Sequence, residues 1–262
     1  MIAKAKSVKG SLAGALYKER PDKDHEIIYQ NNMFGETAHE RWEELRDIAN
    51  LNTRLENKYI ENVVSPPKEI GDQLSREDWE KLAKDYALKS GYGENQWYAV
   101  LHQNTDEKHL HIYANRINFE GKNTIDSEKI GERSGKIAEE LSQERGWKTA
   151  KEISSDKKAD IMQCLENSVS SSRSWDQVAS KMEEQGYVLE LSYQDKNGIK
   201  TLNGARITPV EEYKGKEEMS RREQLSKKGY KLSEIDRNMK IKELDNKLKK
   251  NLEKSQNYGR SL

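Results

Sequence analysis

Two strand-like segments separated by a short polar stretch constrain the fold of this chain most. Residues 96–103 (QWYAVLHQ) are apolar and aromatic, and residues 109–119 (HLHIYANRINF) alternate between polar and apolar side chains. Both patterns are typical of β-strands. The residues between them, 104–108 (NTDEK), are polar and turn-like. We therefore predict an antiparallel hairpin over this region.

Three of the five histidines lie on this hairpin, at His102, His109 and His111. Alternate residues of a strand share a face, so His109 and His111 point to the same side. His102 ends the preceding strand and can reach that side across the pair. Three imidazoles suit a divalent metal, and three protein ligands leave positions open for catalysis. Three ordinary surface histidines, or a purely structural metal, are the alternatives.

Other features exclude several classes of protein. No HExxH helix of a metalloprotease is present, and Cys164 is the single cysteine, which excludes zinc deaminases and disulfide scaffolds. No apolar run approaches the ~20 residues of a membrane span, and the start lacks the apolar stretch of a secretion signal. We expect a soluble cytoplasmic protein. If the metal polarises a phosphoryl oxygen, a separate nucleophile is needed, for which tyrosine is a natural choice.

The charges balance overall but are unevenly placed. The chain has 46 basic and 46 acidic residues, yet residues 219–262 hold thirteen basic against six acidic ones. Residues 1–30 hold six against four. Basic ends fit an anionic partner such as nucleic acid, and a solvated helical tail is the alternative.

Sequence patterns divide the chain into three regions: 1–150, 155–215 and a charged helical tail at 217–262, with a linker at 151–158. Ser11 and Ser75 are expected to cap helices, the second across 76–90. The other expected helices are 36–55, 127–147, 159–168 and 174–185, and the other strands lie within 1–10, 58–65 and 187–193.

Residues 1–150 resemble the nuclease domain of plasmid mobilisation relaxases, the MobA/VirD type of the HUH endonuclease superfamily and its MobP-like group. The resemblance rests on AVLH at 99–102, HLH at 109–111 and Asn115-Arg116, preceded by GYGENQ at 91–96. KGSLAGALYKER at 9–20 resembles the first motif of the family and would make Tyr17 the nucleophile. Ser65, before Pro66-Pro67, stands where the second motif places a serine beside the DNA.

The resemblance implies an α+β fold, with a central antiparallel sheet flanked by helices and the two histidine strands in its middle. His102, His109 and His111 would hold Mg²⁺ or Mn²⁺, with Zn²⁺ left open. Tyr17 would attack one DNA strand at a transfer origin and leave a 5′-phosphotyrosyl enzyme. Implied partners are an accessory mobilisation protein and a coupling protein. The implied location is the bacterial cytoplasm, with transfer alongside the DNA left open.

Some positions depart from the family pattern. Asn104 stands where an aspartate often follows the first histidine, so Asp106, Glu107 or Glu61 is the candidate for orienting a histidine or activating Tyr17. Tyr29 is the rival nucleophile. Three lysines near the start are candidates for phosphate contacts: Lys4, Lys6 and Lys9.

Two other functions remain open from the sequence. A rolling-circle replication initiator or transposase of the HUH type often carries its tyrosine on a helix after the histidines. The expected helix at 127–147 contains no tyrosine, which favours the relaxase order. The other alternative is a non-catalytic, metal-containing nucleic-acid-binding protein.

Overall fold

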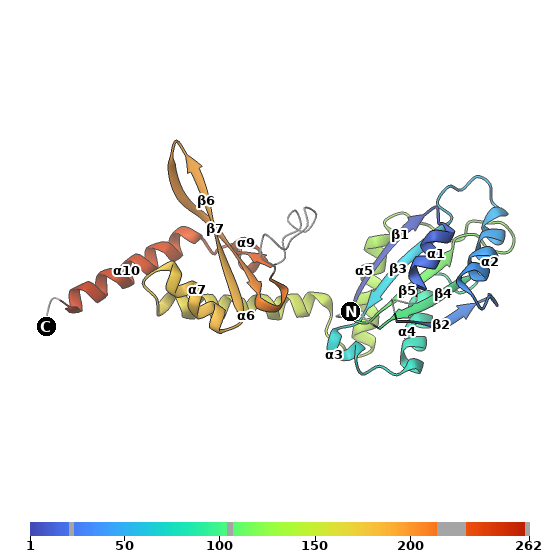
Figure 1. Ribbon diagram of the computed structural model, residues 1–262, viewed down its shortest axis with the longest axis horizontal. Helices are drawn as coiled ribbons and strands as arrows, with labels where there is room; N and C mark the ends of the chain where they lie inside the picture. The colour runs from blue at the N-terminus through green and yellow to red at the C-terminus, as the bar shows by residue number, and fades with distance from the viewer. Residues whose placement is uncertain (21–23, 104–106, 214–228, 260–262) are drawn as a thin grey trace. The chain divides into compact units, whose positions relative to one another are not determined.

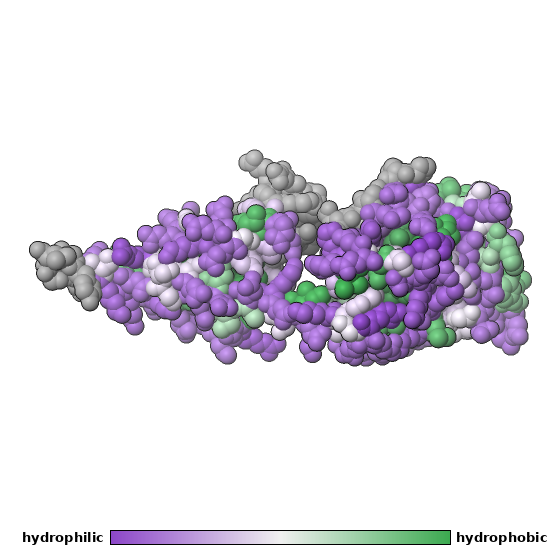
Figure 2. Space-filling model, turned by 90° about the horizontal axis from the view of Figure 1, so that it is seen from below, coloured by the Kyte–Doolittle hydropathy of each residue, from purple (hydrophilic) through white to green (hydrophobic). Residues whose placement is uncertain are grey.

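The computed structural model describes residues 1–20, 24–103, 107–213 and 229–259. The chain forms two compact units, Met1–Glu152 and Ile153–Leu262 (Figure 1). Figure 2 shows a largely hydrophilic surface with apolar residues in small areas, in keeping with a chain that is 35% charged. Among the described residues, no helix combines the length and apolar character that crossing a membrane requires.

The first unit is built on a five-stranded antiparallel sheet. Its strands lie in the order β1-β3-β5-β4-β2 and have these bounds: β1 Ile2–Val8, β2 His25–Asn31, β3 Tyr59–Ser65, β4 Trp97–His102 and β5 His109–Asn115. The predicted hairpin is β4–β5, and β5 is the central strand. The α+β class and the antiparallel sheet flanked by helices are therefore confirmed.

One face of the sheet carries helices α1 (Leu12–Lys18) and α2 (Ala38–Asn50). Figure 1 shows α1 lying across the strands. Ser11 caps α1 by accepting from the Gly14 amide at 3.1 Å, as its sequence predicts. Beneath these helices lies an aromatic core whose buried members are Met33, Leu45, Ala49, Tyr59, Tyr98, Val100 and Tyr113.

The opposite face carries helices α4 (Arg76–Lys89) and α5 (Ile130–Glu144) over the larger core, and the short α3 (Lys68–Gly71) follows β3. Ser75 caps α4 as predicted, with Asp78 completing the capping box. Asn62 of β3 accepts hydrogen bonds from the Tyr86 and Tyr92 hydroxyls, each at 3.0 Å. These bonds join α4 and the loop after it to the strand next to the histidine strand.

The second unit consists of helices around a long hairpin, and its core includes Ile161, Leu165, Val178, Met182 and Ile207. The elements beyond the first unit's sheet and helices are α6 Ala150–Ser170, α7 Trp175–Glu184, β6 Tyr187–Lys196, β7 Ile199–Pro209, η2 Val210–Glu212, β8 Tyr230–Lys231, α9 Leu232–Ile235 and α10 Ile241–Gly259.

The boundary between the two units, at Glu152 and Ile153, falls within the segment 151–158 that was expected to be a linker, and this segment is helical. Thr149 and Glu152 form the reciprocal bonds of a helix start: the Glu152 amide donates to Thr149 Oγ1 at 3.2 Å, and the Thr149 amide donates to Glu152 Oε2 at 2.8 Å. This capping box lets a polar segment begin α6.

The C-terminal region was expected to be a solvated helical tail. The part of it that the structure describes instead contributes to the core of the second unit. Leu232 of α9 and Leu248 of α10 are buried in the core of the second unit. Leu244 and Leu248 are four residues apart and so share one face of α10. Residues 217–228 lie outside the described residues.

Candidate active site

Antiparallel pairing of β4 with β5 brings the three histidines to one end of the sheet. His102 lies opposite His109, and His111 lies opposite Val100, so all three side chains share a face. The ring centroids are 5.2 Å apart for His102 and His109, 4.4 Å for His102 and His111, and 5.0 Å for His109 and His111. One nitrogen from each ring lies within 4.8 Å of the others. The three imidazoles therefore converge as a ligand set would.

The nitrogen spacing fits a divalent ion. The Nε2 atoms of His109 and His111 are 3.2 Å apart, and two nitrogens bound to one ion at ~2.1 Å lie about this far apart. His109 Nδ1 lies 3.0 Å from the Glu107 carbonyl oxygen, to which it can donate. This bond favours the tautomer whose Nε2 lone pair is available to a metal.

The group beside His109 is therefore the backbone carbonyl of Glu107. Of the other candidates for this role, Asp106 lies outside the described residues. Glu61 binds the side chains of Lys18 and Lys6.

The electrostatics also suit a metal. Burial, reinforced by repulsion from His102 and His109, lowers the pKa of His111 to about 3. Its imidazole is therefore neutral at physiological pH, the form that binds metals. The cluster among the described residues consists of three imidazole rings and includes no carboxylate. This set of ligands fits a divalent ion.

The two other histidines are outside this cluster. His25 of the edge strand β2 lies opposite His102, but its Nδ1 faces the Arg20 carbonyl oxygen at 3.2 Å. His39 is exposed on α2 and pairs with Glu43 at 3.4 Å. Variants of His25 and His39 are therefore suitable controls, in tests of metal binding, for variants of the three clustered histidines.

Helix α1 brings Tyr17 close to the histidines. The Lys18 carbonyl oxygen accepts a hydrogen bond from His102 Nε2 at 2.7 Å, and Tyr17 is the preceding residue. The Tyr17 side chain is 53% exposed, with the Arg20 guanidinium 5.7 Å from its ring centre. The candidate nucleophile thus lies on an accessible helix, one residue from a direct contact with the cluster.

Two ion pairs fix the end of α1. Lys18 is 7% exposed, and its Nζ binds Glu61 Oε1 at 2.8 Å. Glu19 pairs with Arg41 of α2, whose Nε donates to Glu19 Oε1 at 3.1 Å. A helix of seven residues has little stability of its own, so these pairs help to fix the position of Tyr17.

Glu61 joins this helix to the sheet. Its Oε2 also binds Lys6 at 2.9 Å. Burial acts to raise the pKa of Glu61, but the bonds from Lys18 and Lys6 outweigh it, so the pKa is lowered overall. Glu61 is therefore a charged partner of two lysines at neutral pH.

Ser65 lies at the histidine end of the sheet. Val63 pairs with His111, and Ser65 follows two residues later on the same face of β3. Its Oγ lies 3.5 Å from the Pro66 carbonyl oxygen.

Tyr29 is placed differently from Tyr17. It packs on Trp97, with ring centres 5.1 Å apart, as part of the core on the α4 and α5 face. The rival nucleophile thus lies on the opposite side of the sheet from the histidines. Of the early lysines, Lys6 pairs with Glu61 and Lys9 with Glu56.

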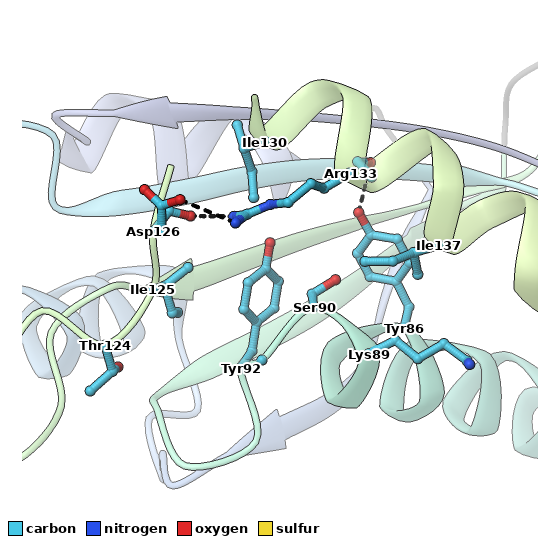
Figure 3. Close-up of a pocket in the computed structure, with 12 residues that line it drawn as sticks. Tyr86, Lys89, Ser90, Tyr92, Thr124, Ile125, Asp126, Ile130, Arg133 and Ile137 are labelled. Atoms are coloured by element: carbon cyan, nitrogen blue, oxygen red, sulfur yellow. Dashed lines mark hydrogen bonds and ion pairs between the residues drawn. The ribbon is translucent and has the colours of Figure 1, made fainter. Parts of the chain in front are cut away.

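A pocket of about 320 Å³ lies on that opposite face, between α4 and α5 (Figure 3). The Tyr86 hydroxyl is hydrogen-bonded to Ser134 Oγ at 2.8 Å, and Arg133 pairs with Asp126 at 3.3 Å. Figure 3 shows this ion pair beside Tyr92. None of the three clustered histidines lines it. The candidate site on the α1 face is therefore separate from this pocket.

Comparison with known families agrees with this arrangement. The family model described as relaxase, MobA/VirD2-like, nuclease domain matches residues 17–147. The match begins at Tyr17, includes all three histidines and spans half of the 262 residues. No curated protein matches the chain. The chain therefore belongs to the MobA/VirD2-like relaxases, a family of DNA-nicking enzymes that act on single-stranded DNA.

Proposed function

We propose that this relaxase makes a site- and strand-specific nick at the transfer origin of a plasmid or integrative element, so that the element can be mobilised by conjugation. The observation that carries the proposal is the 2.7 Å contact between His102 and the Lys18 carbonyl, next to the exposed Tyr17. This contact supports the proposal because it joins the residue after the candidate nucleophile to one of the candidate metal ligands.

Tyr17 is the proposed nucleophile. Its hydroxyl oxygen attacks the scissile phosphorus, its proton goes to a base, and the phosphorus–O3′ bond breaks as the tyrosine–phosphorus bond forms. The departing 3′ oxygen takes up a proton. The 5′-phosphotyrosyl bond retains the energy of the broken phosphodiester, so the reverse reaction can rejoin the strand.

His102, His109 and His111 would hold the divalent ion, for which we propose Mg²⁺ or Mn²⁺, with Zn²⁺ as the alternative. A bound ion of this kind neutralises charge on the non-bridging phosphate oxygens. Ser65, at the same end of the sheet, is proposed to contact the DNA backbone. Lys4, Lys6 and Lys9 are proposed to contribute phosphate contacts.

The proposed substrate also implies partners. An accessory mobilisation protein would expose the single strand at the origin, and a coupling protein would deliver the adduct for export. We place the reaction in the bacterial cytoplasm, where the donor DNA resides.

Mass-spectrometric mapping of a covalent product tests the proposal. The full chain is incubated with Mn²⁺ and overlapping single-stranded oligonucleotides from the replicon that encodes it, and the DNA-bearing peptide is sequenced. We expect one oligonucleotide to be cleaved and its 5′ phosphate to be joined to Tyr17. An adduct on another residue refutes the nucleophile assignment, and the absence of any adduct refutes the transesterase mechanism.

The ion pairs of α1 lead to a separate prediction. We expect Glu61→Gln to lower the rate of adduct formation about 10- to 100-fold, because Lys18 loses its charged partner and α1 its fixed position. Affinity for single-stranded DNA should change little. The rate is measured under single-turnover conditions at saturating enzyme. Glu56→Gln, which removes the exposed partner of Lys9, is the control and should leave the rate unchanged.

A further inference from the structure

A fourth histidine lies beside the candidate metal site. His25 begins the edge strand β2 and lies directly opposite His102 in the ladder with β4. Residues that are opposite each other in an antiparallel pair point to the same face, so the partly exposed His25 side chain lies on the α1 face. The Gln103 amide donates to the Asp24 carbonyl oxygen at 3.1 Å, which continues the ladder past His25. The backbone of His25 is therefore held firmly at the histidine end of the sheet.

A contact with the chain just after α1 determines which nitrogen of His25 carries the proton. His25 Nδ1 lies 3.2 Å from the Arg20 carbonyl oxygen. A carbonyl oxygen can only accept a hydrogen bond, so Nδ1 is the donor and Nε2 keeps its lone pair in the neutral ring. Among the residues that the structure describes, Nε2 has no hydrogen-bonding partner. The ring therefore presents one basic nitrogen that the fold does not use.

The same contact brings His25 close to the end of α1 that carries the proposed nucleophile. The Arg20 guanidinium lies 5.7 Å from the Tyr17 ring centre, so Arg20 contacts Tyr17 with its side chain and His25 with its backbone. Between them, the Lys18 carbonyl oxygen accepts from His102 Nε2 at 2.7 Å. His25 and His102, on adjacent strands, thus both contact the C-terminal end of α1.

Two carboxylates near this end of α1 are already engaged. Glu61 binds Lys18, and Glu19 binds Arg41. A carboxylate that is paired with a cation is a weak proton acceptor, because the pairing favours its ionised form. Imidazole is the side chain that most often accepts a proton in enzymatic catalysis. The geometry and the chemistry therefore both favour His25 as the base.

We propose that His25 is the proton acceptor for Tyr17, a role that rests on Tyr17 being the nucleophile. The Tyr17 hydroxyl proton passes to His25 Nε2 as the tyrosine oxygen attacks phosphorus. The 3′ oxygen leaves with the electron pair of the phosphorus–O3′ bond and takes a proton from water. When a 3′ hydroxyl later attacks the phosphotyrosine, the His25 imidazolium returns the proton to the departing tyrosine oxygen. His25 thus speeds cleavage and religation alike.

Single-turnover assays of adduct formation by the full chain, with Mn²⁺ and an oligonucleotide that the wild type cleaves, test this role. His25→Ala removes the ring. His25→Asn keeps an amide N–H that can donate to the Arg20 carbonyl oxygen but lacks the basic nitrogen, so it separates a positioning role from a proton-accepting one. His39→Ala removes an exposed histidine of α2 and is the matched control.

We expect both His25 variants to form the adduct at least about 100-fold more slowly, the effect of losing a general base, and His39→Ala to match the wild type. Added imidazole should restore part of the rate of His25→Ala and should not speed Tyr17→Phe. The equilibrium ratio of cleaved to intact strand should be unchanged, because a base alters both rates equally. Thermal stabilisation by Mn²⁺ should also be retained.

Three results would overturn the proposal. A His25→Asn variant that nicks at the wild-type rate would show that the bond to Arg20 is all that His25 supplies. Loss of Mn²⁺ stabilisation in either variant would make His25 a metal ligand, and a loss in His25→Ala that imidazole does not restore would reject the proton transfer. In each case the wild-type adduct would still map to Tyr17, whereas its absence from the wild type would refute the proposed function itself.

Discussion

Tyr17→Phe is expected to abolish the covalent protein–DNA product, with a loss on the order of 10³-fold or more in adduct formation, because the substitution removes the attacking oxygen. The ring remains, and with it the contact to the Arg20 guanidinium. Affinity for single-stranded DNA and for metal should therefore be retained. The adduct is measured by its slower migration in denaturing gels and affinity by fluorescence anisotropy.

Tyr29→Phe is the matched control, since Tyr29 packs on Trp97 on the opposite face of the sheet. It should form the adduct at the wild-type rate. A Tyr17→Phe variant that still formed the adduct, or a Tyr29→Phe variant that lost it, would reject Tyr17 as the nucleophile.

The second large effect is expected from the binding of a metal ion to His102, His109 and His111. We expect saturating Mn²⁺ to raise the melting temperature of the nuclease unit by about 5–10 °C, the range given by an ion at ~100 times its dissociation constant. His109→Ala and His111→Ala should each abolish this rise and reduce adduct formation by at least about 100-fold. Differential scanning fluorimetry reports the first effect and denaturing gels the second.

The controls are His25→Ala and His39→Ala. His25 lies opposite His102 but faces a carbonyl oxygen, and His39 lies on α2. Both variants should keep the Mn²⁺-dependent rise. If His25→Ala removed it as completely as His111→Ala does, the ligand set would have to be redrawn to include the edge strand.

Much of the nuclease unit could be predicted because its signals are local. Ser11 and Ser75 mark their helix starts, and the alternation of residues 109–119 marks β5. Strand β2 was not predicted. Its register shifts between Ile27 and Tyr29, and this irregularity breaks the alternation that would identify a strand.

The candidate site, too, could be predicted only in part. The grouping of His102, His109 and His111 follows from strand periodicity and could be predicted. Their partners could not, because the Lys18 and Glu107 atoms that contact them are backbone carbonyl oxygens, which any residue type supplies. The pairing of Lys18 with Glu61 spans 43 positions and depends on how α1 lies on the sheet.

The open position of Tyr17 has a consequence for the fate of the product. A phosphate ester on a side chain that is 53% exposed lies where an incoming 3′ hydroxyl can reach it. If Tyr17 is the nucleophile that we propose, the captured strand would be held in an exchangeable form, and any acceptor end that base pairing brings to the same place would become a substrate for ligation. Such a relaxase would act as a carrier of an activated DNA end, and the identity of the acceptor would decide whether a circle is closed or two molecules are recombined.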